Sequence, residues 1–310
     1  MSTDVDLAAE RLRAGGLVAV PTETVYGLAA DATSPDAIAR IYAAKGRPTD
    51  HPLIVHLADP EDLLGVAAAI PPVAERLAST AWPGPVTVVV ERSDRLPASV
   101  AGGRDTVGVR VPDHPLTREV IRRAGVPVAA PSANRFGRVS PTTAQHVVDD
   151  LGAVLDPELD LVLDGGPSRV GLESTIVDAT VDPPQILRTG GVPAADIDTL
   201  LDGVAATAPP SGPSRASGML PSHYAPACSV VLTEDAAEAA AVAADAAGDD
   251  EVRVLDLTDD VARYARDLYS ELRRADADGV RTLVAVLPPP AGLGAAVRDR
   301  LTKAAAPRPT

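Results

Sequence analysis

Aromatic side chains and cysteine are nearly absent from this sequence. Its 310 residues include one phenylalanine, one tryptophan and five tyrosines, although apolar residues make up 45% of the chain. The hydrophobic cores must therefore be built from Val, Leu, Ile and Ala. The single cysteine, Cys228, cannot form an internal disulfide. Because that is typical of proteins from a reducing compartment, we expect a cytoplasmic protein.

Long apolar runs and basic regions are also missing. No stretch approaches the length of a membrane-spanning segment, and the N-terminus does not resemble a signal peptide, so we expect no membrane association. The formal net charge is −15, with 17 basic and 28 acidic residues in residues 1–203 and 10 and 15 in residues 228–310. Broad binding to nucleic acid needs a basic surface, which this composition excludes. A polyanionic ligand would have to be held by a few cations in a pocket.

The order of the predicted elements indicates an α/β fold for residues 1–203. Periodicity and capping signals predict a domain with a mixed, twisted sheet. Its predicted helices are 5–14, 35–44, 116–124 and 142–151, and its predicted strands are 17–20, 53–57, 86–90, 107–111, 126–130, 161–163, 174–177 and 185–188.

Residues 228–310 have a simpler pattern, with predicted strands 230–232, 252–257 and 282–287, each followed by a helix. Three consecutive βα units predict a small parallel sheet with Rossmann-like winding. No glycine-rich fingerprint follows the first strand, so a dinucleotide site is not predicted. Residues 204–227 between the two domains are rich in Ala, Pro, Ser and Gly and predict an irregular linker.

Lysine is rare, and its placement is informative. The chain has 26 arginines but only two lysines, Lys45 and Lys303. The first lies in Lys45-Gly46-Arg47-Pro48, just after a predicted helix, and His51 and His56 follow closely. A cation pair at a helix end is commonly solvated surface. The two histidines and the sharp turn favour an anion site instead, in which a compact ammonium is preferred to a planar guanidinium.

Four further polar segments follow predicted strands. Residues 21–28 could form a ligand loop or a strand-to-helix turn capped by threonine. Arg110 ends a strand, either as an edge feature or as a ligand contact. The Ser132-Ala133-Asn134 loop, with Ser140 behind it, suits phosphate or ribose contacts, although a helix N-cap at Ser140 or Thr142 is an alternative. Another arginine, Arg188, closes a strand before glycines.

The common catalytic and metal-binding motifs are absent. The sequence has no Cys or His spacing typical of a zinc site, no nucleophile elbow and no Walker loop. These segments predict a groove of dispersed cations and hydroxyls for a triphosphate and a small zwitterion.

Taken together, the motifs of residues 12–193 resemble the YrdC-like family. The matching motifs are P-T-E-T-V-Y-G-L, K-G-R-P, P-L-I-V-H, W-P-G-P-V-T, V-R-V-P, P-S-A-N, G-L-E-S-T-I-V-D and L-R-x-G. The S-H-Y-A-P segment and the tail resemble the two-domain form of L-threonylcarbamoyladenylate synthases. The resemblance implies a YrdC-like catalytic domain with a twisted mixed sheet (residues 1–203), a linker that folds over the groove (204–227) and a small Rossmann-like domain (228–310).

The resemblance also implies a reaction. In this family, L-threonine, bicarbonate or CO2, and ATP give L-threonylcarbamoyl-AMP and pyrophosphate. A separate protein complex then uses the product for the threonylcarbamoyl modification of the tRNA adenosine next to the anticodon. Synthesis of the adenylate takes two steps: the threonine amine is carboxylated to a carbamate, and a carbamate oxygen then attacks the α-phosphorus of ATP. Neither of these steps requires a protein nucleophile, so positioning and charge neutralisation would carry catalysis. Mg2+ is expected as the cofactor, held mainly by the ATP phosphates and not by protein side chains.

Site residues transfer from the family by motif position. The resemblance assigns L-threonine binding to Thr24, His56, Arg110, Ala130 and Ser174, with Arg110 facing the carboxylate. It assigns ATP binding to Lys45, Arg47, His51, Thr106, Ser132, Asn134, Ser140, Arg188 and Tyr224. His51 departs from the family pattern, which has asparagine there, and a histidine could add pH dependence near neutrality.

Three alternatives remain open on sequence alone. A YrdC-like domain can serve another carbamoyl transfer, as in hydrogenase maturation, but this chain lacks the acylphosphatase-like and zinc-finger modules which that role needs. An RNA-binding (tRNA-binding) protein with a YrdC-like fold would need a locally positive groove despite the acidic composition. A catalytically idle regulator is disfavoured because Lys45, Arg47, Arg110 and Arg188 are all present.

Overall fold

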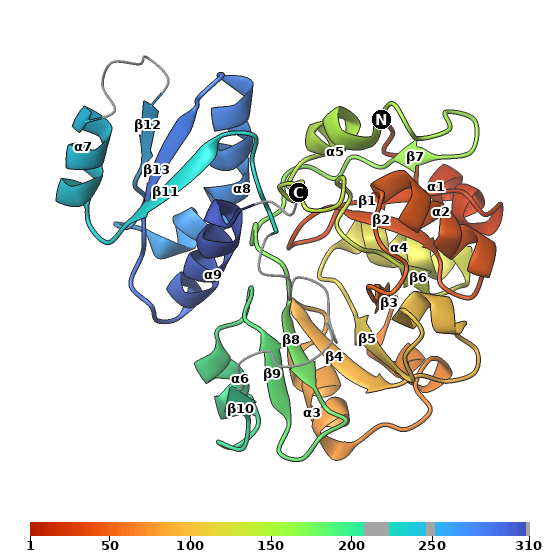
Figure 1. The fold of residues 1–310 in the computed structure, drawn as a ribbon. Helices are drawn as coiled ribbons and strands as arrows, with labels where there is room; N and C mark the ends of the chain where they lie inside the picture. The colour runs from red at the N-terminus through yellow and green to blue at the C-terminus, as the bar shows by residue number, and fades with distance from the viewer. Residues whose placement is uncertain (208–222, 246–251, 308–310) are drawn as a thin grey trace.

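The computed structural model describes residues 1–207, 223–245 and 252–307, and it contains two α/β domains side by side (Figure 1). The larger domain has a ten-stranded mixed sheet in the order β10-β9-β8-β4-β5-β3-β6-β2-β1-β7. Its strands are β1 (Val18–Val20), β2 (Gly27–Asp31), β3 (Ile54–His56), β4 (Val86–Glu91), β5 (Thr106–Arg110), β6 (Val128–Ala129), β7 (Leu161–Val162), β8 (Thr175–Asp178), β9 (Gln185–Arg188) and β10 (Ala206–Thr207).

Helices flank this sheet, and its largest core is aliphatic apart from Tyr26, Tyr42 and Trp82. The helices are α1 (Val5–Arg13), α2 (Pro35–Lys45), α3 (Pro72–Ala81), α4 (Pro115–Ala124), α5 (Ala144–Leu151) and α6 (Ala194–Leu200), with 3-10 turns at η1 (Pro60–Gly65) and η2 (Ala98–Ala101). The predicted α/β class with a twisted mixed sheet is confirmed.

Helix α2 shows how local sequence places a site segment. The Ser34 hydroxyl accepts a hydrogen bond from the backbone N–H of Ala37 at 3.2 Å, and Pro35 occupies the first helical position. Gly46 ends the helix in the left-handed region, with φ of 61°, a conformation that favours glycine. The chain therefore turns sharply between Lys45 and Arg47, and the two side chains have different partners: Lys45 donates to the carbonyl of Asn134 and Arg47 to that of Pro52.

Several elements differ from the sequence prediction. Residues 21–26 connect two antiparallel strands, because β2 follows them and pairs with β1; a strand-to-helix turn is wrong for this segment. Helices α3 and α6 were not predicted. Ala206 and Thr207, expected to be irregular linker, form β10 and pair with β9. The N-cap of α5 is Thr143, and not Ser140 or Thr142. Residues 208–222, most of the predicted linker, lie outside the described residues.

The smaller domain has a three-stranded parallel sheet in the order β11-β13-β12. Its elements are β11 (Ser229–Thr233), α7 (Ala236–Asp245), β12 (Val252–Leu255), α8 (Val261–Ala277), β13 (Thr282–Val286) and α9 (Leu293–Ala305). Alternating residues of β13 face opposite sides: Leu283 and Ala285 pack with α8 and α9, whereas Val284 and Val286 pack with α7. The predicted Rossmann-like winding is confirmed.

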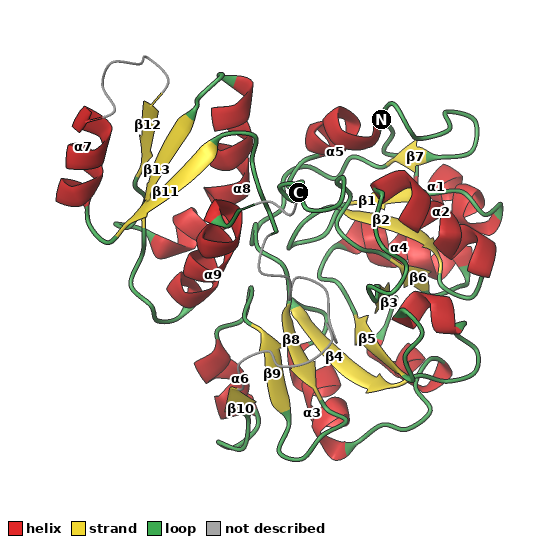
Figure 2. Ribbon diagram, in the orientation of Figure 1, coloured by secondary structure: helices red, strands yellow, loops and turns green. Residues whose placement is uncertain are grey.

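Helices α8 and α9 face the larger domain (Figure 2). Their core includes Val25, Val139 and Leu172, which belong to loops of the larger domain. The small domain therefore packs directly on the loops that follow or precede the strands. No helix in the described part of the chain is long and apolar enough to cross a membrane.

Candidate active site

One pocket is lined by polar side chains that lie at the ends of several strands of the large sheet. His56, Arg110 and Arg188 end β3, β5 and β9, and Ser174 immediately precedes β8. The lining residues are Thr22, Thr24, Val25, Gly27, Arg47, Ile54, His56, Arg110, Ala130, Pro131, Ser132, Glu173, Ser174, Arg188, His223 and Tyr224. They surround about 550 Å3 of space, a volume that includes open solvent.

Arg110 is fixed by three partners at one side of the pocket. Its Nη1 donates to the Thr24 hydroxyl at 2.9 Å and its Nε donates to the carbonyl of Gly84 at 2.9 Å. Its Nη2 lies 2.6 Å from Oε1 of Glu23, a buried carboxylate. The guanidinium is thus oriented before any ligand binds, which favours planar recognition of a carboxylate.

His56 lies beside Arg110, because β3 and β5 are parallel and the two residues are register partners. Burial and the adjacent charge of Arg110 lower the pKa of His56 to about 3. The imidazole is therefore neutral at physiological pH. A neutral ring can donate or accept a hydrogen bond to a zwitterionic ligand without adding charge to this side of the pocket.

Arg188 is tied to the segment that carries Ser174. Its Nη2 donates to the carbonyl of Ser174 at 2.8 Å and to the Ser174 hydroxyl at 3.1 Å. That hydroxyl also lies 2.7 Å from the hydroxyl of Thr87 on β4. Burial is the main cause of a lowered pKa of Arg188, but a guanidinium stays charged at neutral pH.

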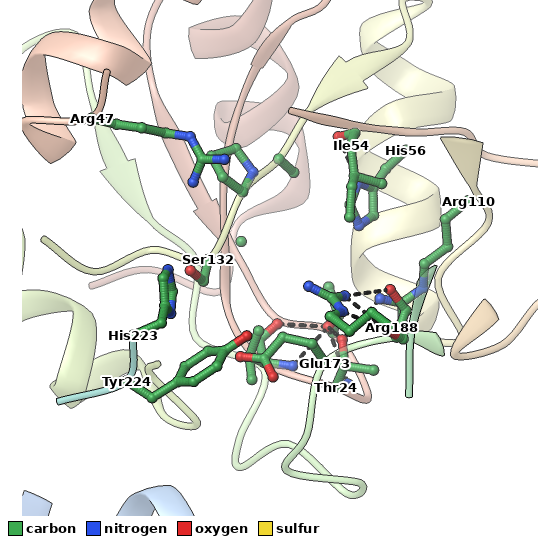
Figure 3. Close-up of a pocket in the computed structure, with 16 residues that line it drawn as sticks. Thr24, Arg47, Ile54, His56, Arg110, Ser132, Glu173, Arg188, His223 and Tyr224 are labelled. Carbon is green, nitrogen blue, oxygen red and sulfur yellow. Dashed lines mark hydrogen bonds between the residues drawn. The ribbon is translucent and has the colours of Figure 1, made fainter. Parts of the chain in front are cut away.

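Arg47 approaches the pocket from another direction, on the side away from Arg110 (Figure 3). Its Nη2 donates to the carbonyl of Pro52 at 3.0 Å, and its guanidinium carbon lies 5.6 Å from the ring centre of Phe136. Burial lowers the pKa of Arg47 to about 10, so it too is charged at pH 7. The pocket therefore presents three arginines from three separate segments.

Nine of the fourteen residues predicted for the site line this pocket: Thr24, His56, Arg110, Ala130 and Ser174 from the threonine set, and Arg47, Ser132, Arg188 and Tyr224 from the ATP set. The structure thus brings together all five residues assigned to threonine. Ligand contacts by any of them remain predictions.

Lys45 does not line the pocket. Its side chain is 2% exposed, and Nζ donates to the carbonyl of Asn134 at 2.6 Å and also to the carbonyl of Ser132. Burial, reinforced by the charge of Arg47, lowers the pKa of Lys45. In this arrangement Lys45 holds the 132–134 loop, and a direct phosphate contact stays a prediction.

Four other predicted ATP contacts also lie outside the pocket lining. Asn134 donates to the carbonyls of Arg135 and Arg138 and so folds its own loop. The Ser140 hydroxyl donates to Glu173. Thr106 lies at the opposite end of β5 from Arg110, about 13 Å away along an extended strand. His51 packs its ring edge-on against that of Phe136. Burial and then Arg47 lower its pKa, so it is neutral near pH 7.

Sequence reasoning assigned no role to Glu173 or His223, yet both line the pocket. Glu173 lies within the motif G-L-E-S-T-I-V-D, but no pattern in the sequence pairs it with the small domain. His223 stood in the linker motif beside Tyr224, and its ring lies 4.2 Å from that of Tyr224. Burial is the main cause that lowers the pKa of His223 to about 3, so it is neutral.

Comparison with known proteins identifies the family. Residues 10–190 match the Sua5–YciO–YrdC family, whose description reads "Telomere recombination". Residues 192–306 match a second family, "Threonylcarbamoyl-AMP synthase, C-terminal domain". The chain belongs to the Sua5–YciO–YrdC family. The resemblance predicted from the motifs is therefore confirmed.

Full-length relatives share both domains. A protein of Pyrococcus abyssi named threonylcarbamoyl-AMP synthase is 40% identical over 97% of this chain and 93% of its own length. A Bacillus subtilis protein with the same name is 37% identical over 97% and 92%. The crystal structure of P. abyssi Sua5 with L-threonine is 39% identical, with a TM-score of 0.90 over 97% of this chain and 94% of that one. The two-domain arrangement described above is thus also that of the P. abyssi structure.

A protein-based metal site does not fit the described residues. No group of three or more His, Cys, Asp or Glu side chains there could hold a metal ion. Glu173 is the one carboxylate among the pocket's lining residues, and its two oxygens accept hydrogen bonds from Ser140, Tyr269 and Arg300. The donor set therefore suits a magnesium ion that is carried by ATP phosphates better than one that is held by a carboxylate cage.

Proposed function

We propose that this chain makes L-threonylcarbamoyl-AMP and pyrophosphate from L-threonine, bicarbonate or CO2, and ATP. The observation that carries the proposal is the convergence of Arg47, Arg110 and Arg188 on one pocket in a chain whose net charge is −15. Cations concentrated in this way suit a polyanionic substrate. The full-length similarity to proteins named threonylcarbamoyl-AMP synthase supports the same reaction.

The geometry divides the pocket into two sides. Arg110, held by Thr24 and Glu23 and next to neutral His56, suits the carboxylate and hydroxyl of L-threonine. Arg188 and Arg47 suit the phosphates of ATP. In the first step the neutral threonine amine attacks the carbon of CO2 and loses a proton, which gives a carbamate. From bicarbonate the same carbamate forms when the C–OH bond breaks and water leaves. A carbamate oxygen then attacks the α-phosphorus, and pyrophosphate leaves.

No step needs a protein nucleophile. The arginines would orient the carbamate and the α-phosphate and offset the charge that accumulates between them. Magnesium bound to the triphosphate would supply further charge neutralisation on the leaving group. We further propose that the product feeds threonylcarbamoylation of tRNA by a separate complex in the cytoplasm.

A pyrophosphate-release assay tests the proposal. We expect release from ATP and bicarbonate only when L-threonine is added, together with a product that has the mass of threonylcarbamoyl-AMP. Release that ignored threonine, or that favoured another amino acid, would overturn the assignment. Steeply salt-dependent tRNA binding in the absence of turnover would instead favour an RNA-binding role.

A further inference from the structure

Glu173 places a negative charge on the wall of a pocket that otherwise presents arginines. Its Oε1 accepts a hydrogen bond from Ser140 at 2.7 Å, and its Oε2 accepts one from the phenol of Tyr269 at 2.8 Å. Oε2 also accepts one from Nε of Arg300 at 2.8 Å. Tyr269 and Arg300 both belong to the small domain, on α8 and α9. The small domain therefore supplies the one cation within ion-pair distance of this carboxylate among the described residues.

Arg300 contacts three separate segments of the site at once. It is 0% exposed, and besides Glu173 its Nη2 donates to the carbonyl of Thr189, directly after Arg188. Its guanidinium carbon also lies 5.2 Å from the ring centre of Tyr224, which lines the pocket. One side chain of α9 thus joins the 171–174 segment, the end of β9 and the described end of the linker. Figure 3 shows Glu173 and Tyr224 side by side at the pocket wall.

The balance of charges around Glu173 keeps it ionised. Burial by itself raises the pKa of this carboxyl, but the charges of Arg300 and Arg188 outweigh burial and hold it at about 2. An ionised carboxylate that lost Arg300 would face the pocket without its ion-pair partner. Because a buried, unpaired charge acts strongly on neighbouring charges, it would repel the phosphates of a nucleotide.

We propose that Arg300 is a positioning residue for the nucleotide, which acts from the small domain by neutralising Glu173 and fixing it beside Tyr224. In this arrangement helix α9 of the small domain supplies the positive charge that neutralises Glu173 in a pocket formed mainly by the larger domain. This inference rests on the proposed function, because it takes ATP as the ligand on this side of the pocket.

The test compares three variants of the full chain. Arg300→Met removes the cation and keeps much of its volume. The pair Arg300→Met with Glu173→Gln removes both charges. Arg298→Met is the control, since Arg298 lies on the same helix but pairs with Glu234 at the surface. Each protein is measured for ATP affinity by calorimetry, for the KM of ATP and of L-threonine, and for folding by circular dichroism.

We expect Arg300→Met to weaken ATP binding by about tenfold or more, because an uncompensated carboxylate then faces the phosphates. The KM for ATP should rise more than the KM for L-threonine. In the paired variant, ATP affinity should return to within about threefold of wild type, since the unpaired charge is gone. Arg298→Met should match wild type. A structural role alone would leave the paired variant as weak as Arg300→Met, and that result would overturn the inference.

Two further outcomes are informative. Should Arg300→Met fail to fold, the paired variant decides: ATP binding within about threefold of wild type supports the inference and binding about tenfold weaker overturns it. A wild-type protein that bound ATP but formed no threonylcarbamoyl-AMP would overturn the proposed reaction, while the calorimetric comparison would still judge Arg300. A wild-type protein that did not bind ATP would overturn both.

Discussion

The side-chain ammonium of Lys45 donates a hydrogen bond to the backbone carbonyl of Asn134 at 2.6 Å. It also donates to the carbonyl of Ser132, which lines the pocket. One of only two lysines in the chain therefore stabilises a loop of the pocket wall. A compact ammonium can reach two carbonyls of one tight loop, whereas a planar guanidinium needs a wider arrangement of acceptors.

Replacing Lys45 by arginine should impair the site although the charge is kept. The larger group has to displace the 132–134 loop, because the position is fully buried. We expect a loss of about tenfold or more in kcat/KM for ATP and a decrease of about 1–3 kcal/mol in the free energy of unfolding, as for other overpacked sites. Steady-state kinetics and urea unfolding measure both. Arg76→Lys, at a surface ion pair with Asp202, is the control. An unchanged kcat/KM for ATP in Lys45→Arg would contradict the role assigned to the loop.

Arg110→Gln should affect threonine more than ATP. Arg110 contacts Thr24 and Glu23 on one side of the pocket, while Arg47 lies on another. We expect the KM for L-threonine to rise about tenfold or more, with a change of less than about threefold for ATP, because a charge-assisted pair to the carboxylate is lost. The substitution also leaves Glu23 unpaired, which lowers stability.

A second substitution separates these two effects. In the pair Arg110→Gln with Glu23→Gln, no buried charge is left without a partner, so stability measured by thermal unfolding should largely recover. The KM for L-threonine should stay high, because the cation is still missing. Recovery of the threonine KM together with stability would show that Arg110 acts only as a structural residue.

The pKa of His56 predicts how stability depends on pH. The folded protein holds this pKa at about 3, whereas an unfolded histidine titrates near 6.5. Between these values the unfolded chain binds a proton that the folded chain does not, so the free energy of unfolding falls as the pH falls. From pH 6 to pH 5 one such histidine lowers it by about 1 kcal/mol.

His56→Gln tests that dependence. The variant should lose about 1 kcal/mol less than wild type between pH 6 and pH 5, a window above most carboxylate titrations. Urea unfolding at the two pH values gives the difference. His223 and His146, with pKa values lowered to about 3 and about 4, still contribute in both proteins. Equal losses in wild type and variant would show that His56 is not buried in its neutral form.

Local signals explain why much of the fold and site could be predicted from sequence. Ser34, Pro35 and Gly46 mark the limits of α2 without help from the rest of the chain, and they place the Lys45 segment at a helix end. Arg110 and Arg188 each follow a run of strand-forming residues. Because neighbouring strands bring their ends together at one edge of a sheet, side chains distant in sequence were expected to share a groove.

Long-range pairing explains what could not be predicted. The contact between Arg300 and Glu173 joins residues 127 positions apart, and no periodicity in either segment indicates it. Strand β2 was missed because four of its five residues are buried, so its sequence lacks the alternation that marks a half-exposed strand. Helix α3, which was not predicted, begins at Pro72 directly after Pro71, because proline is tolerated in the first turn of a helix.

Deleting residues 204–310 should lower the yield of threonylcarbamoyl-AMP. The deletion removes Tyr224 from the pocket wall and removes Arg300 from Glu173. It also exposes Val25 and Leu172, which pack in the core of the small domain. With one wall gone, water reaches the carbamate and the mixed anhydride, so AMP and pyrophosphate should appear in excess of the coupled product. Mass spectrometry of product against released pyrophosphate measures this leak in a truncated protein whose circular dichroism shows that it is folded. An unchanged ratio would mean that the larger domain alone shields the intermediate.

A second substitution separates the electrostatic role of the small domain from its shielding role. Because Glu173→Gln in the truncated chain removes only the unpaired charge, it should improve ATP binding without closing the leak.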